Sequence, residues 1–176
     1  MQNIECEVRA LITEEQYKAL LSRLKKESED LGEEEQVTYY FDSKEDLRIQ
    51  QNTHYAKVWL KKGELHDDHR EEIEIKVPRE DFEKLEQLFL ALGYNVSIKW
   101  FRKRHSFKWH DIDIALDHTR GYGFILEVEK ITTVATQEET VAYLKAYLNE
   151  LGLAPTPKEE FDLKYQYYKE HWRELV

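Results

Sequence analysis

The sequence predicts an α+β fold in which eight antiparallel strands close into a barrel, or tunnel, with amphipathic helices packed outside. Eight segments alternate strictly between apolar and polar residues, a number typical of a barrel. Short turns, as at His110 and around Gly121, favour antiparallel neighbours over parallel crossovers. Amphipathic helices need the apolar sheet face as a partner, so closing the sheet would enclose its polar face.

The predicted strands span 3–12, 36–41, 46–51, 54–61, 70–77, 96–109, 111–118 and 122–131. Each divides into an apolar and an ionic column, because successive side chains point to opposite faces. In the first strand the apolar column is Ile4, Cys6, Val8 and Ala10, and the ionic column is Glu5, Glu7 and Arg9. In the strand 96–109 we assign Arg102 and Arg104 to the ionic face.

Four helices are predicted between and after these strands. Thr13 with Gln16, and Thr136 with Glu139, each read as a capping box before an apolar stripe. A third helix follows Pro78 and stops near Gly93. The last begins at about Lys158, and its aromatic stripe is expected to cover the core and to be able to plug one end of the tunnel: Phe161, Tyr165, Tyr168 and Trp172.

Length and composition limit the function. A chain of 176 residues is the size of one domain, so we expect 1–176 to form a single unit, either a monomer or a homodimer. The net charge of −10 argues against binding to duplex nucleic acid or to an anionic membrane. The chain shows neither an export signal nor a long apolar run, and its one cysteine, Cys6, falls in an apolar column; we expect a cytoplasmic protein in which Cys6 is a core residue.

The ionic columns have two readings. An ordinary sheet with one solvated face would show the same alternation. Here, however, the charges are sorted by strand: carboxylates recur as Glu-x-Glu in three strands, whereas Lys and Arg concentrate in others. This sorting favours an enclosed ligand site.

Carboxylates at positions i and i+2 lie about 7 Å apart on one face, close enough to share a hard cation. Glu5 with Glu7 and Glu127 with Glu129 have this spacing. A site with only oxygen ligands favours Mg²⁺ or Mn²⁺, which bind together with phosphates. The positive charge that a polyphosphate needs would come from Arg48, Lys57, Lys61, Lys76, Arg102 and Arg104.

Several segments together resemble the CYTH superfamily, the triphosphate tunnel metalloenzymes. IECEVR resembles the family's ExExK signature, AKVWLK its basic LRxR strand, EEIEIK the next strand ending in Lys, and RKRHSF a third basic strand. IALDHTRGYGFILEVE resembles its acidic C-terminal motif. The resemblance covers nearly the whole chain and implies an eight-stranded tunnel with a metal side and a phosphate side.

Carried over by matching positions, the metal ligands would be Glu5, Glu7, Asp117, Glu127 and Glu129. The phosphate would be bound by Lys57, Lys76, Arg102 and Arg104, to which the ionic columns add Lys61 and Arg48. We expect the catalytic set to be Glu5, Glu7, Arg9 and Lys76. Two departures suggest a weaker phosphate grip or a different substrate: Arg9 stands where the family has Lys, and Trp59 where many members have Arg.

The expected function is metal-dependent hydrolysis of a triphosphate, whether inorganic tripolyphosphate, thiamine triphosphate or a nucleoside triphosphate. A class IV adenylate cyclase would use the same phosphate grip to make cyclic AMP and pyrophosphate. A binding module would hold polyphosphate or nucleotide without turnover. The polar cluster His66, Asp67, Asp68 and His69 is interpreted as a solvated hairpin tip rather than a metal site.

Overall fold

The structure, a computed structural model, describes residues 4–63 and 69–176. Its strands are β1 (Ile4–Ile12), β2 (Glu29–Phe41), β3 (Asp46–Gln51), β4 (Tyr55–Lys62), β5 (His69–Pro78), β6 (Val96–Trp109), β7 (Ile112–Thr119) and β8 (Gly123–Thr132). Its helices are α1 (Glu14–Glu27), α2 (Phe82–Ala91), α3 (Gln137–Glu150) and α4 (Lys158–Leu175), and a 3₁₀ turn, η1 (Arg79–Asp81), precedes α2. The predicted hairpin tip lies outside the described residues, except for the backbone of His69.

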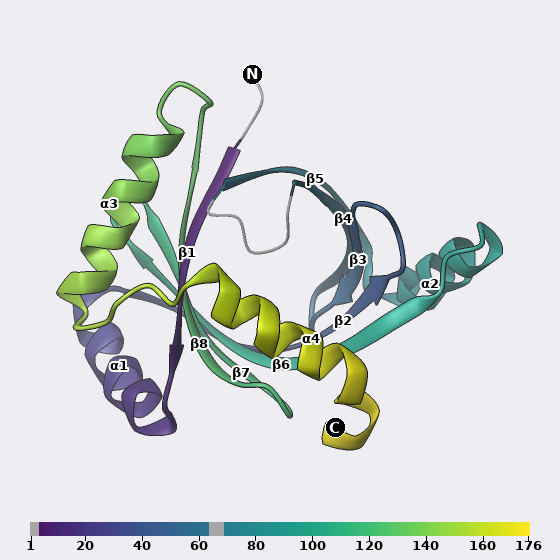
Figure 1. The fold of residues 1–176 in the computed structure, drawn as a ribbon, viewed down its shortest axis with the longest axis horizontal. Coiled ribbons are helices and arrows are strands. Elements are labelled where there is room, and N and C mark those ends of the chain that lie inside the picture. The colour runs from purple at the N-terminus through teal and green to yellow at the C-terminus, as the bar shows by residue number, and fades with distance from the viewer. Residues whose placement is uncertain (1–3, 64–68) are drawn as a thin grey trace.

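The strands form one closed ring in the order β1-β5-β4-β3-β2-β6-β7-β8, and every neighbouring pair is antiparallel. Figure 1 shows this ring with α1 and α3 against one side and α2 against the other. The predicted α+β barrel is therefore confirmed. Among the described residues, β1 and β5 share three residue pairs, whereas β1 and β8 share nine.

Strand β2 is longer than predicted, because it begins at Glu29 rather than at residue 36. The added stretch is strongly acidic, a composition with low strand propensity. Basic residues of β6 offset this low propensity, because Glu29 lies opposite Lys108 and Glu34 lies opposite Arg104. Cross-strand pairs of opposite charge stabilise a sheet, so a strand that looks unfavourable alone becomes favourable beside β6.

The helix caps confirm one predicted capping box and contradict the other. At α1 the Thr13 hydroxyl accepts a hydrogen bond from the Gln16 amide at 3.1 Å, and the Gln16 side chain accepts one from the Thr13 amide at 2.8 Å. At α3 the Thr136 side chain makes no cap bond; its hydroxyl lies 3.0 Å from that of Thr133 instead. The local turn thus competes successfully for the Thr136 hydroxyl.

The apolar columns of the strands meet the helices on the outside of the ring. Under α1 and α3, the buried core includes the whole apolar column of β1, with Cys6 fully buried as expected. Under α2, Phe82 packs with Ile49 and Ala56. The outer face of β5 differs, since Ile73 and Ile75 remain 47% and 58% exposed. In the described part of the chain, no helix is long and apolar enough to cross a membrane.

Helix α4 packs through its predicted aromatic stripe. Phe161, Tyr168 and Trp172 are buried against aromatic residues of the ring, among them Trp100 and Tyr122. Figure 1 shows α4, in yellow, crossing in front of one edge of the ring. The segment before α4 is fixed to β1, because the Thr156 amide donates to the Arg9 carbonyl at 3.0 Å and the Thr156 hydroxyl accepts from the Leu11 amide at 2.9 Å.

Candidate functional site

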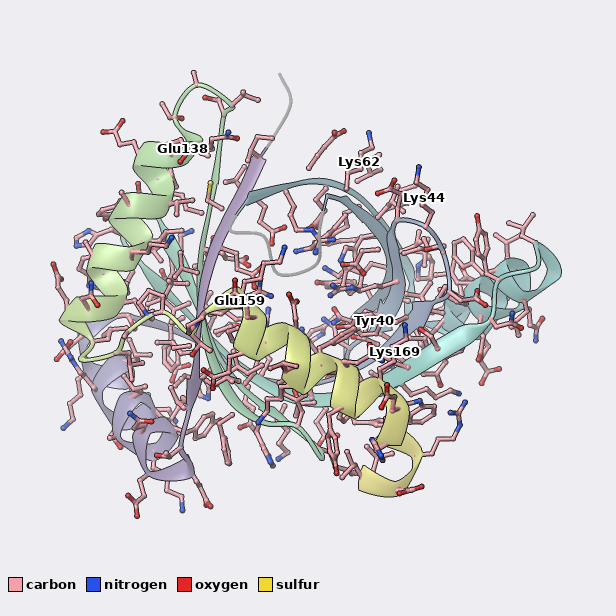
Figure 2. All side chains as sticks on the ribbon, viewed as in Figure 1. Tyr40, Lys44, Lys62, Glu138, Glu159 and Lys169 are labelled. Atoms are coloured by element: carbon pink, nitrogen blue, oxygen red, sulfur yellow. The ribbon has the colours of Figure 1, made fainter. Side chains whose placement is uncertain are left out.

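The ring encloses a polar cavity of about 360 Å³ that is lined by side chains from strands far apart in sequence. Figure 2 shows side chains that project from the strands into the ring, with Tyr40 on the side near α4. Most of the predicted site residues line this cavity: Glu5, Glu7, Arg9, Arg48, Lys57, Lys61, Arg102, Arg104, Glu127 and Glu129. The ionic columns therefore face inward, and the reading of a solvated outer sheet face is wrong.

One wall of the cavity, on the neighbouring strands β1 and β8, carries four carboxylates: Glu5, Glu7, Glu127 and Glu129. Glu7 lies directly opposite Glu129 in the strand register, and Glu127 lies opposite Arg9. Burial, together with the nearby Glu7, raises the pKa of Glu129 to about 7. Burial would also raise the pKa of Glu7, but Arg9 and Lys61 outweigh it and hold this pKa below its usual range. Crowded carboxylates of this kind are stabilised by positive charge.

A second acidic group surrounds Lys61. Its ammonium nitrogen lies 2.6 Å from Glu5 Oε1, 3.2 Å from Glu72 Oε2 and 3.9 Å from Glu7 Oε2. Burial raises the pKa of Glu5 well above its usual range despite Lys61, and a hydrogen bond to Glu72 adds to the rise. Burial would raise the pKa of Glu72 as well, but that hydrogen bond and Lys61 lower it to about 2.

Asp117, a predicted metal ligand, is fully buried and does not line the cavity. Both of its oxygens accept from Arg104, Oδ1 from Nε at 2.8 Å and Oδ2 from Nη2 at 2.6 Å. Arg102 adds a third bond, from Nη1 to Oδ2 at 3.0 Å. Arg104 also donates to Glu127. Asp117 therefore fixes two arginines on the cavity wall, while its role as a metal ligand stays a prediction.

A buried amide also holds Arg102, which sequence patterns did not reveal. The side-chain oxygen of Gln36 accepts from Arg102 Nε at 2.9 Å and from Gln50 Nε2 at 3.2 Å. Gln50 in turn donates to the Thr38 hydroxyl at 3.0 Å. Arg102 is thus clamped between Gln36 and Asp117, which fixes the direction of its guanidinium.

Two further cations are positioned by aromatic rings and acids. The Arg48 guanidinium lies 4.3 Å from the centre of the Tyr40 ring and 5.5 Å from that of Trp59, and it donates to Asp46 at 2.6 Å. Lys57 Nζ lies 4.4 Å from the Trp59 ring centre. Trp59, one of the two departures from the CYTH pattern, therefore faces the cavity and contacts cations instead of adding one.

Lys76 is the predicted site residue that is most exposed. It does not line the cavity, and its side chain is 58% exposed, 3.7 Å from Glu74 and over the Tyr55 ring at 4.7 Å. Its predicted catalytic and phosphate-binding roles therefore stay predictions. The cavity wall also contains residues outside the predicted set: Glu34, Gln36, Tyr40, Gln50, Tyr55, Trp59, Arg70, Glu72, Glu74, Trp100, Ser106, Tyr122, Ile125, Ile131, Phe161 and Tyr165.

Some of these residues carried a signal in the sequence. Arg70, Glu72 and Glu74 stand in the ionic column of β5, and alternation alone would have added them to the site. Phe161 and Tyr165 belong to the aromatic stripe predicted to be able to plug one end of the tunnel, and the packing of α4 across the ring brings both to the cavity.

The donor set fits a hard divalent cation such as Mg²⁺ or Mn²⁺, since Glu5, Glu7, Glu127 and Glu129 offer only oxygen ligands. Across residues 4–63 and 69–176, no three acidic, histidine or cysteine side chains are grouped closely enough to hold an ion. Basic side chains lie between the carboxylates instead, with Lys61 next to Glu5 and Arg104 next to Glu127.

Comparison with known proteins agrees with this architecture. A putative adenylate cyclase of Methanocaldococcus jannaschii is 33% identical over 86 residues, which cover 48% of each chain; the match thus spans about half of that relative. Among solved structures, the PH1012 protein of Pyrococcus horikoshii has a TM-score of 0.75 and 26% identity over 88% of this chain and 92% of its own.

A putative adenylyl cyclase from Hippeastrum, described with a dominant triphosphatase activity, has the same fold, with a TM-score of 0.66 at 18% identity over 93% of this chain and 95% of its own. The family model that matches is the CYTH domain, and it covers residues 3–160. A match of that extent, on a closed ring with the charged interior described above, shows that the chain belongs to the CYTH domain family.

Proposed function

We propose that this chain is a phosphohydrolase that binds a small-molecule triphosphate in the cavity and hydrolyses it with Mg²⁺ or Mn²⁺. The observation that carries the proposal is that one cavity holds both a wall of carboxylates and a set of basic side chains. Glu5, Glu7, Glu127 and Glu129 come from β1 and β8, whereas the cations come from other strands: Arg48, Lys57, Lys61, Arg102 and Arg104. A polyphosphate with a bound metal carries the complementary charges, because the metal cation can bind the carboxylates while the phosphate oxygens bind the basic side chains.

The residues of the chain would divide the work between binding and orientation. Glu5, Glu7, Glu127 and Glu129 would hold the metal, which supplies positive charge to the phosphate oxygens and activates water. Arg102 and Arg104, already fixed by Asp117, would bind phosphate oxygens and stabilise the charge that develops on them, with no reorganisation cost. Arg9 stays protonated and would bind or orient rather than accept a proton.

Adenylate cyclase is the second candidate, because the relative that is 33% identical over 86 residues has that name. Both reactions need the same grip on the triphosphate and differ in the nucleophile, which is water in one and the ribose 3′-hydroxyl in the other. Within the described residues, no side chain of the cavity identifies a purine ring as the group to be bound. Hydrolysis is therefore the reaction that we favour.

The test is incubation of the purified chain with tripolyphosphate, thiamine triphosphate and ATP in Mg²⁺ or Mn²⁺, with phosphate, pyrophosphate and cyclic AMP resolved as products. We expect phosphate from at least one substrate, none in EDTA, and loss of most turnover in Glu127→Gln. Glu138→Gln, on the exposed start of α3, is the control and should be silent. Cyclic AMP as the main product would support the cyclase, and binding without any product would support a binding module.

A further inference from the structure

Lys61, near the end of β4, lies among carboxylates rather than among phosphate-binding cations. Its three acidic neighbours are Glu5 and Glu7 of β1 and Glu72 of β5, and we name these three the acidic cluster. The side chain of Lys61 is only 12% exposed. Burial would lower the pKa of Lys61, but Glu7 and Glu5 outweigh it and raise this pKa above its ordinary value. Lys61 therefore remains an ammonium ion in the place where the carboxylates are densest.

The other lysine on the cavity wall has different partners. Lys57 Nζ lies 2.6 Å from Glu74 and over the Trp59 ring, and neither residue belongs to the carboxylates proposed to hold metal. Lys61, in contrast, contacts two of those carboxylates directly. A divalent cation that binds Glu5 and Glu7 must therefore compete with Lys61, but not with Lys57.

We propose that Lys61 is a tethered cation that holds the acidic cluster until a divalent metal and a polyphosphate enter together. Lys61 then gives up Glu5 and Glu7 and turns its flexible side chain to phosphate oxygens. Metal alone would leave the displaced ammonium with only Glu72 of its three acidic neighbours, and polyphosphate alone would face carboxylates that no metal neutralises. Each ligand should therefore strengthen binding of the other, and this coupling is reciprocal.

The inference rests on the proposed function for the identity of the two ligands, but its test needs no turnover. Free Mn²⁺ is measured by electron paramagnetic resonance during titration into the metal-free chain, without polyphosphate. We expect Lys61→Gln to bind Mn²⁺ about tenfold more tightly than the wild type or better, because the competing charge is gone. Lys62→Gln, next in the chain, is the control and should stay within about twofold of the wild type, because Lys62 is 48% exposed and pairs with Glu71 outside the cavity. Lys61→Arg, which keeps the cation, should bind no more tightly than the wild type.

Equal or weaker Mn²⁺ binding by Lys61→Gln would overturn the inference. If that variant fails to fold, the inference can still be tested on the wild type. Its lysines are acetylated with and without Mn²⁺, and the labelled positions are measured by peptide mass spectrometry. Saturating Mn²⁺ should increase labelling of Lys61 several-fold, because the side chain is only 12% exposed while it contacts Glu5 and becomes accessible to the reagent once it is displaced. Labelling of Lys57 should not change. Unchanged labelling of Lys61 would contradict the proposal.

The two proposals fail independently. Tighter Mn²⁺ binding by Lys61→Gln in a chain that releases no phosphate would refute the hydrolase and leave the tethered cation standing. If instead the chain releases phosphate but Lys61→Gln binds Mn²⁺ no more tightly than the wild type, the hydrolase proposal stands and the tethered cation is refuted.

Discussion

Replacing Arg104 by alanine should destabilise the fold far more than replacing Lys103, its neighbour on β6, by alanine. Arg104 makes two bonds to Asp117, at 2.8 and 2.6 Å, and Asp117 is fully buried. Without Arg104, Asp117 would retain a single bond from Arg102. Breaking a buried pair from one side leaves an uncompensated charge and costs about 3–5 kcal/mol. Total stabilities are about 5–15 kcal/mol, so this loss would be a large part of the whole.

Urea unfolding at pH 7 measures this loss, with Lys103→Ala as the control. Lys103 is the adjacent residue but is 52% exposed, 3.5 Å from Glu33, so its loss should cost no more than about 1 kcal/mol. The double variant Arg104→Ala/Asp117→Ala should be more stable than the sum of its single changes predicts, because the buried carboxylate and its main cationic partner are removed together. The interpretation of Asp117 as the residue that fixes the arginines would be refuted by either of two results. One is a loss of less than about 1 kcal/mol in unfolding free energy for Arg104→Ala, and the other is a double variant whose loss equals the sum of the two single losses.

Two further predictions concern Asp46 and Arg9. Burial would raise the pKa of Asp46, but Arg48 and Arg70 lower it to about 2, so ionised Asp46 stabilises the fold above about pH 4 and less as the pH falls toward 2. The difference in unfolding free energy between wild type and Asp46→Asn should therefore shrink by about 1 kcal/mol from pH 7 to pH 3, and an unchanged difference would contradict the pairing. Arg9→Lys, which keeps a cation beside Glu7, should keep the reaction product and change turnover by less than about tenfold in steady-state assays, whereas Arg9→Ala should weaken substrate binding. A hundredfold gain in Arg9→Lys, with a new ionisation near neutral pH, would show instead that a base acts at this position.

Strand alternation, the amphipathic helices and the sorting of charge by strand together predicted the ring and the inward direction of most charged residues, because the period of two fixes a residue's face locally and the helices need the apolar face. Alternation placed Glu5 with Glu7, and Glu127 with Glu129, on the ionic faces of their strands, whereas their meeting on one wall follows from the pairing of β1 with β8. Sequence could not predict the extension of β2 to Glu29, since that stretch is stable through charges on β6 that lie far away in the chain.

Inside the site as well, local patterns predicted the face of a residue but not the contacts that it makes with distant parts of the chain. Asp117 and Lys76 match the family pattern by position, but whether a side chain reaches the cavity depends on what its neighbours leave open. Two arginines hold Asp117 behind the wall, and Lys76 lies over Tyr55. The clamp of Gln36 on Arg102 depends on strand register between β2 and β6, which no local pattern encodes.

The most direct test of the proposed reaction is to follow oxygen from the solvent. The chain is incubated in ¹⁸O-labelled water with Mn²⁺ and with each triphosphate that it consumes, and the products are analysed by mass spectrometry. Hydrolysis in the charged cavity predicts one ¹⁸O atom incorporated per turnover, in the phosphate products, and none when EDTA removes the metal. Unlabelled pyrophosphate formed together with a cyclic nucleotide would contradict it.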